Sequence, residues 1–155
     1  MTFNGWTISK ELYAWIKDNL DNGLTILELG SGEGTRNLME SYIVHSIEHN
    51  GKWVGFVKGG NYIHAPIKQY QRYRWYDIDK IKNLPAYDLI LVDGPTGPIG
   101  RWGFYKNIDL FNTDVPIIID DIHRTQERLL AEVLAFEFGK ELTEYGTDRK
   151  FIVLK

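Results

Sequence analysis

The chain has 155 residues, of which 43% are hydrophobic and 14% aromatic, and its formal net charge is −3. This composition can bury a core, and the length is typical of one domain, so we expect a single domain over residues 1–155. The small negative charge excludes a general attraction to nucleic acid or anionic lipid, and the absence of cysteine excludes disulfides and thiolate metal sites.

In chain order, apolar spacing and turn residues predict the following elements. They are a helix over 8–20, a strand over 24–29, a short helix over 35–42, a strand over 43–49, a weak helix over 52–58, a strand over 61–67, a helix over 75–84, a strand over 87–95, a helix over 101–111, a strand over 115–121, a helix over 125–138, and a final hairpin of 141–145 with 150–155. No signal-peptide pattern and no apolar run of about 18 residues occurs, so we expect a cytoplasmic protein that does not enter the membrane.

The alternation of helices and strands predicts the fold class α/β. We expect a Rossmann-like three-layer sandwich, in which helices cover both faces of a seven-stranded, mostly parallel sheet with a C-terminal antiparallel hairpin strand. Ligands of such folds bind beyond the carboxyl ends of the strands. The candidate site therefore lies among residues 30–35, 48–49, 65–67, 93–101 and 120–124.

A glycine loop follows the first predicted strand, with glycines at Gly30, Gly32 and Gly34. Such a loop lets a ligand touch backbone N–H groups, although tight turns use glycine too. The spacing is one residue shorter than the G-x-G-x-x-G of dinucleotide-binding proteins, and Glu33 in the loop would repel a pyrophosphate. A cationic or zwitterionic ligand therefore suits the loop better than a phosphate.

An acidic residue, Glu48, ends the second predicted strand, 18 positions after Gly30. A carboxylate at about this distance can accept hydrogen bonds from both hydroxyls of a ribose. The alternative is a solvated strand end. The glycine loop and the acid together favour a ligand that contains a nucleoside.

The segments ILELGSGEGT, HSIEH and YDLILVDGP resemble those of the class I S-adenosylmethionine-dependent methyltransferases, and the resemblance covers nearly the whole chain. It implies that the glycine loop passes under the methionine portion of S-adenosylmethionine, that carboxylates lie near its ammonium and its ribose, and that the ends of the second and third strands border its adenine. The cofactor-binding residues implied in this way are Glu28, Gly30, Ser31, Gly32, Glu33, Gly34, Thr35, Glu48, His49, Pro66, Ile67 and Asp93.

The loop after the fourth predicted strand begins with Asp93, which would face the methyl end of the cofactor. Its pattern VDGP…G…GR resembles that of glucuronoxylan and related polysaccharide O-methyltransferases and of similar small bacterial enzymes. This narrower resemblance implies a glycan or other small hydroxyl compound as the methyl acceptor, with Arg101 pairing with a carboxylate or phosphate on it. Trp6 is a further candidate for covering the acceptor.

The fifth predicted strand ends in IIIDDIHR, which adds Asp120, Asp121 and His123 to the neighbourhood of Asp93. The metal-dependent catechol-type O-methyltransferases are similar here, but they carry an amide where this chain has Asp121. The three aspartates would suit Mg²⁺ or Mn²⁺, which lowers the pKa of a hydroxyl. The alternatives are metal-free general-base catalysis by Asp93, Asp121 or His123, and a helix-capping role for Asp121.

Three other functions stay open. Segment 68–76, KQYQRYRWY, mixes basic and aromatic residues, which suits a nucleic-acid methyltransferase as well as an anionic sugar, although no Asn-Pro-Pro-Tyr-type motif accompanies it. Tyr76 and Lys80 form a Y-x-x-x-K pair similar to that of short-chain dehydrogenases, but too early in the chain and without the glycine spacing for NAD. A module that binds the cofactor without catalysis is the third. The sequence does not indicate the oligomeric state.

Overall fold

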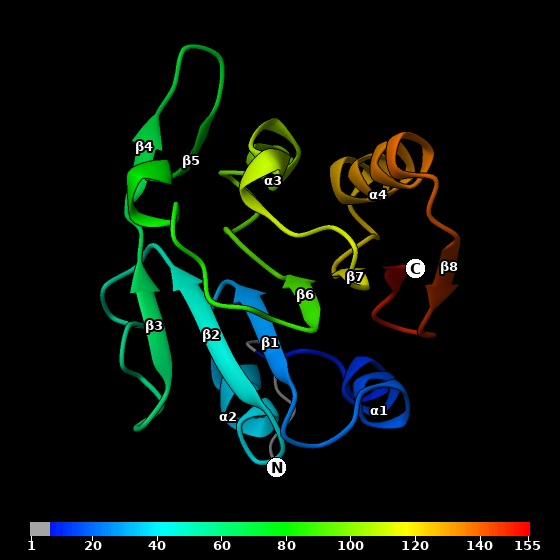
Figure 1. The fold of residues 1–155 in the computed structure, drawn as a ribbon. Helices are drawn as coiled ribbons and strands as arrows, with labels where there is room; N and C mark the ends of the chain where they lie inside the picture. The colour runs from blue at the N-terminus through cyan, green and yellow to red at the C-terminus, as the bar shows by residue number, and fades with distance from the viewer. Residues whose placement is uncertain (1–6) are drawn as a thin grey trace.

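The computed structural model describes residues 7–155, and a seven-stranded sheet forms its centre (Figure 1). The strands lie in the order β3–β2–β1–β6–β7–β9–β8, and β9 runs antiparallel to both of its neighbours. Their bounds are β1 Thr25–Leu29, β2 Ile43–Glu48, β3 Asn61–His64, β6 Leu89–Val92, β7 Ile117–Ile119, β8 Leu142–Tyr145 and β9 Phe151–Leu154. The predicted α/β class, with a mostly parallel sheet and a C-terminal hairpin, is confirmed.

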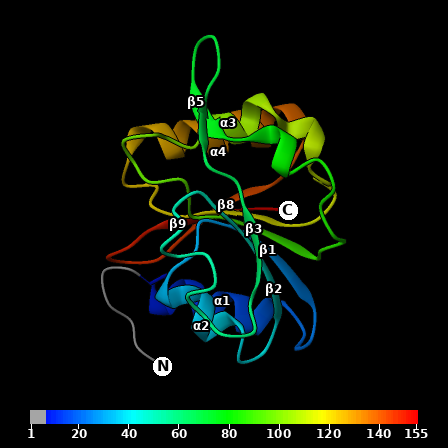
Figure 2. The ribbon, with the colours of Figure 1, turned by 90° about the vertical axis from the view of Figure 1, so that its left-hand side faces the viewer.

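Helices cover both faces of this sheet. The helices α1 (Lys10–Asn19) and α2 (Glu33–Leu38) lie on one face, and α3 (Trp102–Lys106) and α4 (Thr125–Phe138) lie on the other (Figure 2). Neighbouring strand residues point to opposite faces, so Ile26 packs in the α1–α2 core and Leu27 in the α3–α4 core. The two cores explain why β6, β7 and β9 are apolar on both faces.

Three predicted elements differ from the observed ones. Segment 52–58 forms turns instead of a weak helix, since glycines at both ends and within it leave no continuous apolar face. The helix predicted over 75–84 is instead strand β5 (Arg74–Tyr76) followed by a single 3₁₀ turn, η1 (Ile78–Lys80). The helix predicted over 101–111 is split into α3 and a second 3₁₀ turn, η2 (Ile108–Leu110).

A β-hairpin accounts for the second of these differences. Strand β4 (Ile67–Gln69) pairs antiparallel with β5, with Ile67 opposite Tyr76 and Gln69 opposite Arg74. Trp75 of β5 is fully buried and lies directly on α3, where a Cβ added to Gly103 would meet Trp75 Cγ at 2.0 Å. The hairpin leaves the carboxyl end of β3 and extends past the α3–α4 layer (Figure 2).

None of the helices within residues 7–155 is long and apolar enough to cross a bilayer.

Candidate active site

A cavity of about 460 Å³ lies at the carboxyl ends of the parallel strands. Its wall runs from the glycine loop after β1, across the ends of β2 and β6, to the end of β7. The volume is in the range of small-molecule sites, and the chain reverses its strand order here, between β1 and β6. The predicted site residues that line it are Glu28, Gly30, Ser31, Gly32, Gly34, Glu48, His49, Asp93, Arg101 and Asp121.

The glycine loop is kept free of side chains by close backbone packing. Gly30 has a φ of +92°, and a Cβ there would lie 3.0 Å from Cα of Gly94, so the loops after β1 and β6 touch through their backbones. A Cβ on Gly34 would lie 3.0 Å from the backbone nitrogen of Ile8. These two glycines therefore allow the backbones that form the cavity floor to pack closely. The ligand site lies above this floor.

Glu28, at the floor of the cavity, is a buried carboxyl group. Its Oε2 accepts hydrogen bonds from the hydroxyls of Thr35, at 2.7 Å, and Ser46, at 2.6 Å. Burial raises the pKa of Glu28 to about 7, although these two hydrogen bonds oppose the shift and the charge of Glu48 adds to it. Near neutral pH, the side chain can therefore gain or lose a proton, and a cation in the cavity would favour its ionised form.

Glu48 lies at the glycine-loop end of the cavity, and its side chain is charged. Its Oε2 accepts from Ser31 N at 2.8 Å, its Oε1 accepts from Asn50 N at 2.6 Å, and His49 Nδ1 lies 3.0 Å from Oε1. Burial favours the protonated form, but the hydrogen bonds from His49, Asn50 and Ser31 outweigh it and lower the pKa of Glu48. A carboxylate oxygen that accepts one N–H retains a lone pair for a ligand hydroxyl.

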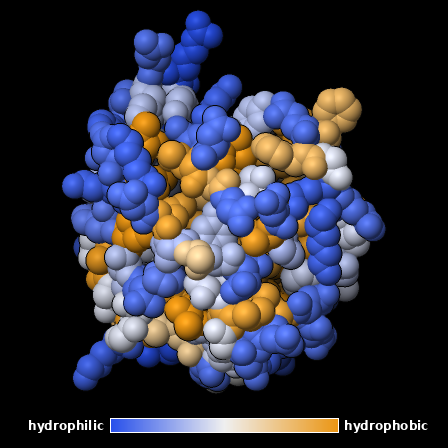
Figure 3. Space-filling view, viewed as in Figure 1, coloured by the Kyte–Doolittle hydropathy of each residue, from blue (hydrophilic) through white to orange (hydrophobic). Residues whose placement is uncertain are grey.

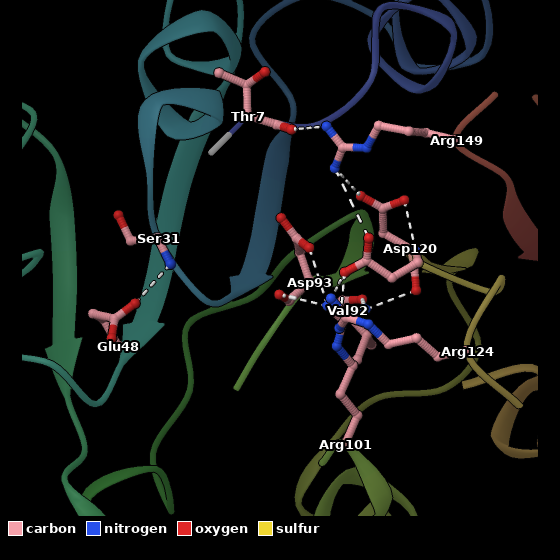
Figure 4. Close-up of polar contacts among 10 residues, drawn as sticks. Thr7, Ser31, Glu48, Val92, Asp93, Arg101, Asp120, Arg124 and Arg149 are labelled. Carbon is pink, nitrogen blue, oxygen red and sulfur yellow. Dashed lines mark hydrogen bonds and ion pairs between the residues drawn. The ribbon is translucent and has the colours of Figure 1, made fainter. Parts of the chain in front are cut away.

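At the other end of the cavity, three aspartates meet three arginines (Figure 4). Arg101, on the loop before α3, extends up to the strand ends and donates to Asp93 Oδ1 at 3.2 Å and to Asp121 Oδ2 at 2.8 Å. Its other terminal nitrogen donates to the carbonyls of Val92, at 3.1 Å, and Asp120, at 2.7 Å. Arg101 thus ties the end of β6 to the end of β7.

Two further arginines complete the cluster. Arg124 Nη1 lies 3.1 Å from Asp121 Oδ2, and Arg149 Nη2 lies 3.6 Å from Asp120 Oδ2. Arg149 also donates to the carbonyl of Thr7. Formal charges in the cluster therefore balance.

The predicted role of Arg101 in substrate binding does not match its surroundings. Its side chain is only 2% exposed, and both terminal nitrogens donate to the strand ends. A guanidinium committed in this way has little capacity left for an anion on a substrate. We therefore assign Arg101 to holding Asp93 and Asp121 in place.

The aspartates do not fit a divalent cation. Asp121 Oδ2 accepts from Arg101 and lies 3.1 Å from Arg124 Nη1, and Asp120 is fully buried, with its Oδ1 accepting from Asp121 N at 2.8 Å. Guanidinium groups this close would repel Mg²⁺ or Mn²⁺. Among residues 7–155, no cluster of three or more His, Cys, Asp or Glu side chains could hold a metal ion.

Asp93 is the carboxyl group best presented to the cavity, with 29% of its side chain exposed against 13% for Asp121. Burial and the nearby Asp120 carboxyl raise the pKa of Asp93 well above its usual range, and Arg101 offsets this only in part. A carboxylate with a raised pKa is the better proton acceptor.

Several predicted site residues lie away from the cavity wall. Glu33 turns outward to Arg36, with 3.4 Å between its Oε2 and Nε of the arginine, and Thr35 lies beneath the floor against Glu28. Pro66 and His123 are exposed, while Ile67 packs on the main core, and none of the three lines the cavity. Trp6 lies outside the described residues.

The structure adds residues that sequence patterns did not single out. Asn50 and Trp53 line the cavity beside His49, and Thr7, Arg124 and Arg149 line its other end. Asn50-Gly51 is a recognisable turn signal after β2, so the loop itself could have been found. The arginines come from segments more than 20 residues apart, and only the fold brings them together.

Comparisons with known proteins connect this fold with methyltransferases. The chain matches no protein-family model and no curated protein sequence. Among solved structures, it is similar to the C-terminal domain of precorrin-6Y C5,15-methyltransferase from Rhodobacter capsulatus, with a TM-score of 0.65, 11% identity, and 97% of this chain and 90% of that one covered. A methyltransferase from Pyrococcus furiosus gives a TM-score of 0.59 at 12% identity, with 99% and 86% covered.

A proposed tRNA methyltransferase from Streptococcus pneumoniae, solved in complex with S-adenosyl-L-methionine, is similar with a TM-score of 0.59 at 13% identity, and 96% of this chain and 72% of that one are covered. At these identities, the likeness establishes the fold. The chain thus has the Rossmann-like fold of S-adenosylmethionine-dependent methyltransferases.

Proposed function

We propose that the protein is an S-adenosylmethionine-dependent methyltransferase. The observation that carries this proposal is the cavity above the glycine loop. One carboxyl group, Glu28, lies at its floor, and another, Glu48, lies beside the loop, away from the Asp–Arg cluster. Among residues 7–155, the glycine-loop end of the cavity presents the carboxyl groups of Glu28 and Glu48 and no Lys or Arg side chain, which suits a cofactor with an ammonium and a ribose and opposes one with a pyrophosphate. The shared fold, including that of a structure in complex with S-adenosyl-L-methionine, supports the same cofactor.

The residues present fit the parts of this cofactor. Glu48 would accept from the ribose hydroxyls on the remaining lone pair of Oε2, and Glu28 would compensate the ammonium. His49, Asn50 and Trp53 would border the adenine, in place of the predicted Pro66 and Ile67. When bound, S-adenosylmethionine supplies an electrophilic methyl group.

We further propose O-methylation of a sugar or another small hydroxyl compound, with Asp93 as the general base. Asp93 opens into the cavity and would take the proton from the acceptor hydroxyl. Arg101 holds its carboxyl in position, and Asp121 fixes Arg101 in turn. Because His123 lies outside the cavity wall, we do not retain it as a candidate base.

A nucleic-acid acceptor is a second candidate, and the β4–β5 hairpin favours it. Arg72 and Arg74 are exposed on this hairpin, which extends from the same edge of the sheet as the cavity. Lys68 is already paired with Asp77 and Asp79 at 3.4 Å each, so the free positive charge is small. We therefore rank this candidate below a small acceptor.

Transfer of a radiolabelled methyl group tests the proposal. Neutral sugars, uronic acids, catechols and short oligonucleotides would be offered as acceptors, with EDTA or with Mg²⁺. We expect transfer to at least one hydroxyl acceptor, at the same rate with EDTA as with Mg²⁺. Transfer only to oligonucleotides would favour the second candidate, and loss of activity in EDTA would overturn the metal-free assignment.

A further inference from the structure

A second cavity, of about 500 Å³, adjoins the first. The two share Gly97 and Arg124 in their walls, so they meet at the loop after β6 and the start of α4. The second cavity is formed by the loop before α3 and the first turn of α4. Its lining residues are Gly97, Ile99, Gly100, Trp102, Arg124, Thr125, Gln126 and Glu127.

Arg124 is the cation at the junction of the two cavities, and it is available where Arg101 is not. Its side chain is 39% exposed, and among residues 7–155 it forms one ion pair, with Asp121 Oδ2 at 3.1 Å from Nη1. A Cβ on Gly97 would lie 3.4 Å from both Cζ and Nη1 of Arg124, so the loop passes directly over the guanidinium. Asp121 thus holds one edge of the guanidinium, and its other N–H groups remain for a ligand.

The other walls suit a ring-shaped ligand. Trp102 Nε1 donates to Gln126 Oε1 at 2.6 Å, which fixes the indole as a wall of the second cavity. An indole face can pack against the apolar face of a sugar ring, while nearby polar groups fix its orientation. Glu127 is the acid in this wall, and it is 2% exposed.

We infer that the second cavity is the acceptor subsite and that Arg124 selects an anionic sugar by pairing with its carboxylate or phosphate. This inference rests on the proposed function, because it places the acceptor beside the cofactor cavity. A planar guanidinium can donate two parallel hydrogen bonds to either anion. The acceptor hydroxyl would then lie toward Gly97 and the first cavity, where Asp93 is found.

Calorimetry with three matched sugars tests the inference. Glucose, glucuronate and glucose 6-phosphate share a ring and differ in the group at its sixth carbon, and each would be titrated into protein saturated with S-adenosylhomocysteine. We expect at least one of the anions to bind about tenfold or more tightly than glucose, since that ratio corresponds to about 1.4 kcal/mol. Which of the two binds identifies carboxylate or phosphate as the group recognised.

Variants assign the selectivity to its residue. Arg124→Gln should abolish the preference for the anion, and Arg124→Lys should keep part of it. Arg128→Gln should keep all of it, because Arg128 lies one turn further along, in α4, and pairs with Glu144 outside both cavities. Equal binding of the three sugars, binding of none, or an unchanged preference in Arg124→Gln would overturn the inference. S-adenosylhomocysteine binding is measured first in each protein. If the wild type does not bind it, the proposed function is wrong, and the sugar titrations do not decide the inference.

Discussion

Glu28 places a carboxyl group where burial opposes its charge. Its pKa is raised from the ordinary 4.5 to about 7, chiefly by burial. The folded protein therefore holds this proton more tightly than the unfolded chain, and the associated stability is present below about pH 4.5 and is lost as the pH rises to about 7. At about 1.4 kcal/mol per pKa unit, the loss amounts to about 3 kcal/mol.

We expect Glu28→Gln to remove this pH dependence. Urea unfolding at pH 8 should show the variant to be more stable than the wild type by up to about 3 kcal/mol, with little difference near pH 4.5. Its affinity for S-adenosylhomocysteine should fall, because the ammonium loses a carboxylate. Parallel stability curves for the two proteins would show that Glu28 titrates normally.

Substitution by asparagine should lower turnover at Asp93 and stability at Asp121. Asp93→Asn should leave folding nearly intact and lower turnover about 100-fold or more, the usual scale for loss of a general base. Since a base must be ionised, wild-type turnover should rise with pH through the raised pKa of Asp93, and the variant should lack this limb. A wild-type rate in Asp93→Asn would place the base elsewhere.

Asp121→Asn should instead lower stability, by about 2–3 kcal/mol, because its carboxylate pairs with Arg101 and Arg124. Asparagine tolerates the left-handed backbone that Asp121 adopts, with its φ of +59°, so the backbone itself is not strained further. Thermal unfolding measures the effect. A stable variant with lost turnover would show that Asp121 acts in the chemistry and that its role in holding Arg101 is secondary.

Among the elements, the β4–β5 hairpin is anchored to α3 by one close contact. Alanine in place of a glycine inside a helix usually stabilises a protein by about 0.5–1 kcal/mol. Gly103→Ala should do the reverse, by about 2 kcal/mol or more, since its Cβ would meet Trp75 Cγ at 2.0 Å. Gly51→Ala is the control, because its Cβ would meet nothing nearer than His64 Cε1 at 4.0 Å. Equal stability of both variants would show that the hairpin is not docked through Trp75.

Sequence patterns predicted some helices and strands more accurately than others. The helix over 125–138 was predicted to the residue, because its apolar spacing is regular and Gly139 ends it in the left-handed conformation. The hairpin was missed because Trp75 and Tyr76, followed by polar residues and Ile78, also fit a helical spacing. Its strand pairing depends on contacts with α3, which lies more than 25 residues further along the chain.

For the molecule as a whole, the sequence predicted the cofactor end of the site better than the acceptor end. Glu28, the glycine loop and Glu48 belong to local strand–loop–helix units, so their place followed from the order of the elements. The Asp–Arg cluster joins four separate segments, and its pairing converts three apparent metal ligands into a balanced ionic network. Charge balance of this kind depends on three-dimensional proximity, which local spacing does not encode.

Hydropathy over the surface agrees with a site confined to the cavities. Hydrophilic side chains cover most of the face in Figure 3, including the upper left, where the β4–β5 hairpin extends in the same view. Hydrophobic areas lie between them, and several adjoin one another in the upper centre of the view. The hydrophilic character of this face is compatible with recognition in the two adjoining cavities.

Calorimetric titration with S-adenosylhomocysteine and, separately, with NAD tests most directly whether the protein binds S-adenosylmethionine as its cofactor. We predict micromolar binding of S-adenosylhomocysteine, no binding of NAD, and a loss of about 1–3 kcal/mol in Glu48→Ala, where the ribose hydroxyls lack their charged acceptor. Arg128→Gln, changed outside the cavity, should bind like the wild type. Micromolar binding of NAD with none of S-adenosylhomocysteine would contradict the account.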